Sequence, residues 1–181
     1  RQFTTSVDGV SYTFRTLETY FAKDNGSGVY NFLTTEGSDQ IPVHEGEEKT
    51  KTFISGETEE RQVFVIPDEN IDTKTASVLV YDTVSSTQFI QYTPLAEAST
   101  IDKDTTVFTI REAPNGFYEL NFGDGISFGK KPDPGNKIVV TYLSTKGPAA
   151  NLADTFTATS DLTVQGINYT LTAVTASEAT G

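Results

Sequence analysis

The sequence predicts a mainly β fold, built of antiparallel, sandwich-like sheets with hairpin connections and almost no helix. Apolar runs that alternate with polar residues recur every ~8–12 residues, which is the strand spacing of an all-β domain. Glycine, proline, asparagine and aspartate separate these runs, so turns are expected between the strands. The segment 95–99 favours one helical turn, and no longer helix is indicated.

The N-terminal part of the sequence is predicted to form β-hairpins. Residues 10–14 alternate after the turn-forming pair Asp8-Gly9, which predicts a strand entered from a turn. The segment 24–28, Asp-Asn-Gly-Ser-Gly, predicts a loop before a returning strand over 29–34. The charged residues 45–51 are expected to be solvated. Further strands are predicted at 52–54, 63–66, 78–81, 89–92 and 107–110. Near the C-terminus we expect 156–159 to pair with 169–172 around Gln165-Gly166.

Residues 115–151 contain the clearest pattern. Apolar and polar residues alternate over 118–122, and Gly123-Asp124-Gly125 then supplies residues that tolerate positive φ, which predicts a strand ending in a tight turn. Pro134-Gly135 fits the centre of a type II turn. The strand 138–143 is apolar on both faces and is therefore expected inside a sheet. We expect both strands to fill the core through Tyr118, Leu120, Phe122, Ile138, Val140 and Tyr142.

Composition limits the function classes. The chain of 181 residues has 25 acidic and 13 basic residues and a formal net charge of −12. Such a charge opposes binding to nucleic acid and to anionic membranes, so neither is an expected partner. The absence of cysteine excludes disulfides, thiol catalysis and cysteine metal sites. No apolar run approaches the ~18 residues that a transmembrane helix needs.

One literal catalytic motif is present. Residues 125–129 read Gly-Ile-Ser-Phe-Gly, the pattern of a serine hydrolase nucleophile elbow. That elbow needs a helix after the serine, whereas Pro132 and Pro134 follow and disfavour one. The single histidine, His44, also precedes Ser127, against the order of residues in those hydrolases. The motif is therefore interpreted as a turn.

Other candidate sites are incomplete. The glycines at 123, 125 and 129 do not have the spacing of a dinucleotide or phosphate loop. His44 has no second histidine, and Asp102 with Asp104 lacks the remaining ligands of a calcium loop. A glycosidase carboxylate pair stays open because its separation in space decides that chemistry. The sequence predicts no catalytic, cofactor-binding or metal-binding residue and no enzyme.

A set of residues in the central stretch resembles the signature of the baseplate J-like family, structural proteins of contractile phage tails and related injection machines. The matching positions are Phe122, Gly123, Asp124, Gly125, Gly129, Pro132, Pro134, Gly135, Asn136, the strand 139–142, Gly147 and Asn151. Weaker similarity extends to 12–16, 43–46 and 64–67. The spacing from Gly125 to Gly129 is longer than in the short form of the wider family, which favours its T-even-like branch of large ring-forming wedge subunits.

The resemblance implies a scaffold role in the tail baseplate of a virion, after assembly in the host cytoplasm. The implied partners are copies of the same chain and other baseplate wedge proteins, with dimeric contacts partly outside this segment. The family's role also implies participation in the rearrangement that triggers sheath contraction. Because the chain starts at Arg1 rather than at a methionine, we expect a fragment, and the resemblance implies that it is the middle of a longer subunit.

The resemblance also suggests a domain organisation. The segment after Gly147 is expected to return to the N-terminal hairpins, so that 1–58 and 148–181 form one β unit. Residues 59–147 would be an inserted β domain with the Phe-Gly-Asp-Gly signature. The polar segment 56–61, with three glutamates and no apolar residue, fits a boundary there. A carbohydrate-binding or adhesin module, also all-β and acidic, is the alternative function.

Overall fold

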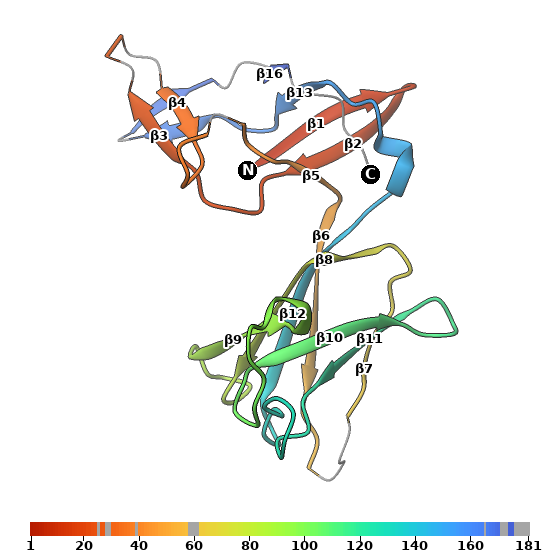
Figure 1. Ribbon diagram of the computed structural model, residues 1–181. Coiled ribbons are helices and arrows are strands. Elements are labelled where there is room, and N and C mark those ends of the chain that lie inside the picture. Colours follow the sequence, from red (N-terminus) through yellow and green to blue (C-terminus); the bar gives the residue numbers. More distant parts are fainter. Residues whose placement is uncertain are drawn as a thin grey trace. The chain divides into compact units, whose positions relative to one another are not determined.

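The computed structural model describes residues 1–24, 26–27, 30–38, 40–57, 62–164, 166–170 and 174–175. Nearly all regular structure is strand, which confirms the predicted β class (Figure 1). The described residues contain two short 3-10 turns, η1 (Leu95–Glu97) within the segment expected to be helical and η2 (Gly147–Ala150). In the described ranges, no helix has the length and apolar character needed to cross a membrane.

The chain divides into two compact units. The first contains residues 1–47 and 145–181, and the second contains residues 48–144. The segment 56–61, proposed from sequence as a boundary, is therefore not where the chain passes from one unit to the other, and 58–61 lie outside the described residues. The reason is β6 (Glu47–Ile54), which pairs with β12 (Lys137–Ser144) of the second unit. The charged segment expected to be solvated is mostly exposed, but it forms the start of β6.

The first unit has a five-stranded sheet in the order β16-β13-β1-β2-β5. The sheet strands are β1 (Gln2–Val7), β2 (Val10–Arg15), β5 (His44–Glu45), β13 (Thr155–Ala158) and β16 (Val174–Thr175). Asp8 and Gly9 join β1 to β2 with φ of 51° and 80°. Two consecutive positive φ values are those of a type I′ hairpin turn, so this pair acts as the sequence predicted.

The neighbours of β13 in the first unit differ from the pairing that the sequence predicted. β13 lies beside β1, with Phe3 opposite Ala158, and its other neighbour is β16 (Figure 1). The predicted pairing of 156–159 with 169–172 is wrong, because β14 (Leu162–Val164) and β15 (Ile167–Tyr169) form a separate hairpin. Residues 165 and 171–172 of that prediction lie outside the described residues. β3 (Phe21–Asp24) and β4 (Tyr30–Leu33) form another hairpin, as predicted.

A small aromatic core holds the five-stranded sheet to the segment after η2. Phe14 and Phe156 meet edge to face with ring centroids 4.9 Å apart, and both are buried. Ala150 and Ala153 complete the cluster together with Tyr12. The chain after η2 therefore packs against the N-terminal hairpin.

The second unit is one seven-stranded sheet in the order β6-β12-β8-β9-β10-β11-β7, curled into a nearly closed, barrel-like form. The further strands are β7 (Phe64–Ile66), β8 (Ile71–Tyr81), β9 (Phe89–Pro94), β10 (Val107–Glu112) and β11 (Tyr118–Phe122). One registered pair, β9 with β10, is parallel, which departs from the purely antiparallel expectation. β12 lies between β6 and β8, as its two apolar faces predicted.

The barrel interior contains the predicted core. Leu120, Ile138 and Val140 are fully buried, and Tyr142 is nearly so. Tyr118 and Phe122 are partly buried and pack on the same cluster. Residues of β7, β8, β9 and β10 complete the core: Phe64, Ile66, Ile71, Val78, Val80, Tyr92 and Phe108.

The Pro134-Gly135 turn adopts the predicted geometry and anchors the start of β12. Gly135 has a φ of 82°, and the Asn136 N–H donates to the Asp133 carbonyl at 3.1 Å, as in a type II turn. The turn is bound to the end of β6, because the Ser55 carbonyl accepts from Gly135 N–H at 2.9 Å. The Asn136 side-chain amide also donates to the Asp82 carbonyl at 2.9 Å, next to β8.

A buried carboxylate joins three segments of the second unit. Asp68 accepts hydrogen bonds from Lys49 Nζ at 2.9 Å, from Ser144 Oγ at 3.2 Å and from the Asn70 N–H at 3.0 Å. Burial raises the pKa of Asp68, but these hydrogen bonds and the charge of Lys49 outweigh it and lower the pKa overall. Burial, with the nearby Asp68 charge, raises the pKa of Tyr142 to about 12.

Acidification should destabilise the second unit through Asp68. Its pKa is lower in the folded protein than in the unfolded chain, where an aspartate has a pKa of about 3.9. The group therefore contributes stability that is complete above the unfolded pKa and is lost as the pH falls through the folded pKa. We expect the free energy of unfolding to decrease between about pH 5 and pH 2 in urea titrations. An Asp68→Asn variant should show a weaker decrease, and an unchanged slope in that variant would contradict the assignment.

Candidate functional site

The signature residues 122–129 form a compact loop after β11. The Asp124 carboxylate is its centre, because Oδ1 accepts from the N–H groups of Ile126, Ser127 and Phe128 at 2.8, 2.9 and 2.9 Å. Ser127 Oγ donates to Asp124 Oδ2 at 3.1 Å. These hydrogen bonds stabilise the ionised carboxylate and therefore strongly lower the pKa of Asp124. The bonds from the Phe128, Ile126 and Ser127 N–H groups contribute most to this lowering. The turn predicted from Gly123-Asp124-Gly125 is present, and an aspartate organises it.

The three glycines of this loop have two different roles. Gly125 and Gly129 adopt φ of 70° and 67°, the left-handed region that glycine favours. Gly123 does not have a positive φ, which corrects the reason given for it from sequence. A Cβ on Gly123 would lie 2.1 Å from the Gly129 carbonyl oxygen and 2.2 Å from that of Phe128. Gly123 is required because two backbone segments meet there.

A second loop supports the first. The Gly129 N–H donates to the Asp102 carbonyl and the Lys130 N–H to the Thr105 carbonyl, both at 2.7 Å. Asp102 Oδ1 in turn accepts from Asp104 N–H at 2.9 Å and from Thr105 Oγ1 at 2.7 Å. Asp102, considered from sequence as a possible calcium ligand, thus fixes a turn. Within the described ranges, no group of three or more histidine, aspartate or glutamate side chains is placed to hold a metal ion.

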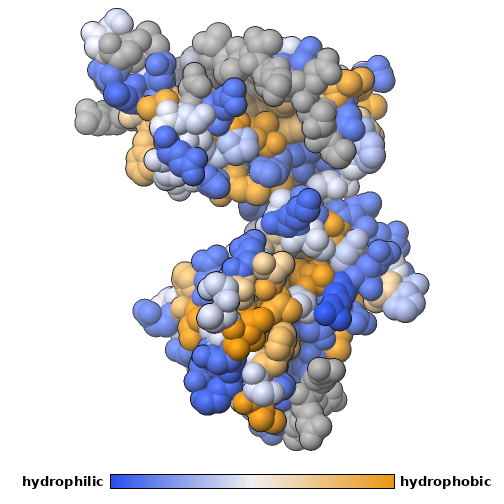
Figure 2. Space-filling model, viewed as in Figure 1, coloured by the Kyte–Doolittle hydropathy of each residue, from blue (hydrophilic) through white to orange (hydrophobic). Residues whose placement is uncertain are grey.

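The loop 123–129 carries exposed apolar side chains. Ile126 is 80% exposed and Phe128 is 43% exposed. On the face seen in Figure 2, apolar residues of the second unit reach the surface in patches bordered by hydrophilic residues. Because the backbone beneath Ile126 is tied by the Asp124 hydrogen bonds, this side chain is presented from a fixed loop.

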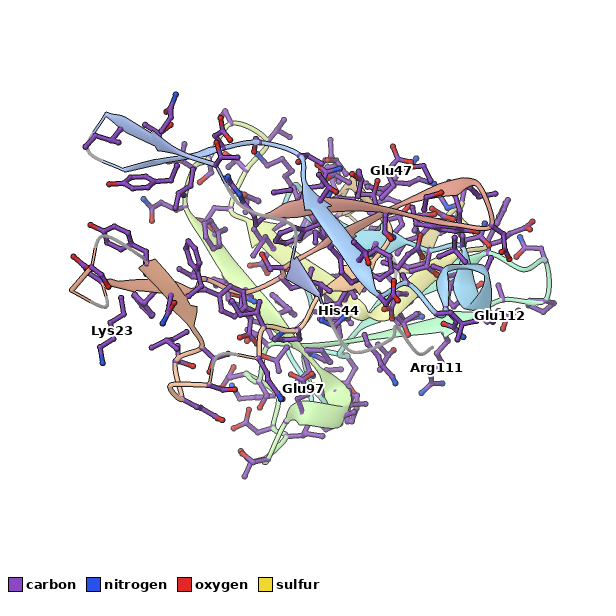
Figure 3. All side chains as sticks on the ribbon, turned by 90° about the horizontal axis from the view of Figure 1, so that it is seen from above. Lys23, His44, Glu47, Glu97, Arg111 and Glu112 are labelled. Atoms are coloured by element: carbon purple, nitrogen blue, oxygen red, sulfur yellow. The ribbon has the colours of Figure 1, made fainter. Side chains whose placement is uncertain are left out.

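A cleft with a volume of about 340 Å³ adjoins the loop. Among its lining residues are Thr109, Arg111, Glu119, Asn121, Phe122 and Phe128. The first two come from β10 and the next two from β11, where Thr109 lies opposite Asn121 and Arg111 opposite Glu119. Arg111 extends outward from its strand (Figure 3). Sequence reasoning missed this site, although the alternation of 118–122 already placed Glu119 and Asn121 on the face opposite the core.

The structure does not form the arrangement that the hydrolase motif requires. The chain after Ser127 continues through bends to Pro132, and no helix begins there. Ser127 Oγ is bonded to Asp124, while His44 belongs to the first unit, on β5 (Figure 3). The interpretation of residues 125–129 as a turn agrees with this geometry.

The residues that resemble the signature are divided between the two units. Residues 122–136 lie in the second unit, at the end of β11, in the following loop and in the turn before β12. Gly147, with a φ of 60°, begins η2 of the first unit, and Asn151 follows it, donating its N–H to the Pro148 carbonyl. No model of a known protein family matches this chain, and no curated protein matches it.

Proposed function

We propose that this protein is a structural component of a contractile phage tail baseplate, a wedge or ring scaffold whose work is done by protein contacts. The resemblance of residues 122–151 to the baseplate J-like signature suggests the assembly. The observation that supports a contact role is the loop 123–129, in which hydrogen bonds from three backbone N–H groups to the Asp124 carboxylate fix the backbone of an isoleucine that is 80% exposed.

The physical argument is one of preorganisation. A loop that is already fixed loses little conformational entropy on binding, so an apolar side chain at its tip retains more of its burial energy. Interfaces obtain most of their affinity from a few such buried anchors. Ile126 is therefore the residue that we assign to a contact with a neighbouring subunit, whose partners would be copies of this chain or other wedge proteins.

The proposal also specifies where the subunit resides and how it acts. The subunit would reside in the tail baseplate of the virion, assembled in the host cytoplasm, and would change its contacts when the baseplate rearranges and the sheath contracts. It would act through bistable packing of interfaces, without enzymatic chemistry. The net charge of −12 disfavours direct contact with nucleic acid or an anionic membrane.

The test is sedimentation of the native, full-length protein from infected cells on a size gradient, with mass spectrometry of the fractions. We expect the protein in a particle far larger than itself, together with other tail proteins. An Ile126→Asp variant should move largely to the slow fractions, because a buried interfacial charge without a partner is strongly unfavourable. The matched control is Ile167→Asp on β15, where the isoleucine is 57% exposed outside this loop.

Two results would contradict the proposal. If the wild-type protein sediments alone as a small species, it is not a stable part of a tail assembly. If the protein is found in the particle but Ile126→Asp incorporates as well as the Ile167→Asp control, the assembly stands and the assigned contact is wrong.

A further inference from the structure

The cleft beside the loop offers hydrogen-bonding side chains that the fold itself does not use. Arg111 and Glu119 lie opposite each other in the register of β10 and β11, yet they form no ion pair with one another. Neither side chain, nor that of Thr109, has a hydrogen bond or ion pair within the described residues. Asn121 makes one long bond, from Nδ2 to the Glu119 carbonyl at 3.4 Å. The side chains that line the cleft from β10 and β11 therefore present both hydrogen-bond donors and acceptors.

The charges in the cleft balance. Arg111 and Lys131 contribute positive charge, and Glu119 and Asp124 contribute negative charge. The chain as a whole carries −12, so this balance is local. An anionic ligand would be repelled by the rest of the molecule and a cationic one would meet Arg111, which together favour an uncharged ligand.

The strands that line the cleft are paired with each other. In the register of β10 and β11, Thr109 lies opposite Asn121 and Arg111 lies opposite Glu119. β10 also pairs with β9 at Val107 and Phe108, and β11 pairs with β7 over Tyr118–Leu120. Their side chains form a group of polar atoms on neighbouring strands, which suits a ligand with hydroxyl groups directed to several sides.

An aromatic side chain completes the site. Phe128 lines the cleft and is 43% exposed, and Phe122, at the end of β11, also lines it. The C–H face of a sugar ring packs on such rings while its hydroxyls bond to amide, carboxylate and guanidinium groups. The volume is at the low end of the range of about 300–1,000 Å³ for small-molecule sites, which fits one or two sugar rings.

We propose that this cleft binds an uncharged carbohydrate, with Arg111, Glu119 and Asn121 bonding its hydroxyls and Phe128 packing against a ring face. The inference does not depend on the scaffold role, because it concerns the cleft and not the contact made by Ile126. A free sugar and the terminal residue of a polysaccharide share this chemistry. No cleavage of the sugar is implied.

The test is titration of the isotopically labelled chain with glucose, galactose and N-acetylglucosamine, each alone, followed by two-dimensional NMR. We expect saturable shifts at Thr109, Arg111 and Asn121 with at least one sugar. An Arg111→Ala variant should bind that sugar about tenfold more weakly, the loss expected for a hydrogen bond to a charged group. The matched control is Lys23→Ala, which also removes a positive charge, from the exposed β3 of the first unit (Figure 3).

The outcomes are distinguishable. Thermal unfolding of Arg111→Ala must match that of the wild type, so that weaker binding reports the site; if it does not, Asn121→Ala is the second variant for the same titration. Absence of saturable shifts with all three sugars, shifts confined to residues away from the cleft, or wild-type affinity in both variants would overturn the proposal. Saturable shifts at these residues with a short neutral peptide, and none with the sugars, would also overturn it. None of these results bears on whether the protein enters a tail particle.

Discussion

A Gly123→Ala substitution is expected to prevent stable folding of the second unit. The added Cβ would lie 2.1 Å from the Gly129 carbonyl oxygen, and the atoms that it meets belong to the backbone, so no flexible side chain can move away to make room. Relief would require the loop 123–129 to separate from β11 and to lose the bonds at Asp124. We expect a cost of at least about 4 kcal/mol, a size that point substitutions seldom reach.

The measurement is urea unfolding followed by NMR signals from each unit, with Gly135→Ala as the matched control. Gly135 has a φ of 82°, but no atom lies within 4 Å of its added Cβ, so the cost should be only the ~1–2 kcal/mol of a left-handed alanine. Gly125→Val should fall between the two, because a β-branched residue at positive φ is strained and the Lys131 Cβ lies 3.4 Å away. Equal losses for Gly123→Ala and Gly135→Ala would show that close backbone approach is not the reason for Gly123.

The second large effect is expected from Asp68→Ala. This substitution leaves Lys49, Ser144 and the Asn70 N–H without their common acceptor. Removing one partner of a buried charged pair typically costs about 3–5 kcal/mol. Because the Lys49 side chain is 44% exposed and can turn to water, we expect the lower part of that range or slightly less, about 2–3 kcal/mol. The readout is the free energy of unfolding at neutral pH.

A double-mutant cycle separates the ion pair from the other bonds of Asp68. Lys49→Met keeps the length of the side chain but removes its charge. We expect a coupling of about 1 kcal/mol between the two sites, with most of the loss in Asp68→Ala arising from Ser144 and Asn70. If Lys49→Met alone destabilised the protein as much as Asp68→Ala, the carboxylate would be serving mainly the ion pair, contrary to this assignment.

Local pattern was enough for the strands and several turns. Asp8-Gly9 and Pro134-Gly135 specify turn geometry through their own φ preferences, and both turns formed as predicted. Alternation placed Leu120 and Ile138 in the core, because successive side chains of a strand point to opposite faces. These features depend on residues adjacent in the chain, and the sequence by itself determined them.

Strand partners and sites depend on residues far apart in the chain, and only the tertiary structure decided these. Nothing local shows that β6 pairs with β12, that β13 pairs with β1, or that β9 and β10 run parallel. Gly123 is required because the backbone at Gly129, six residues later, comes back against it. A glycine in the sequence does not by itself show whether it is needed for close backbone approach or for a positive φ. Arg111 and Glu119 become one site through strand register, which is set by packing of the whole sheet.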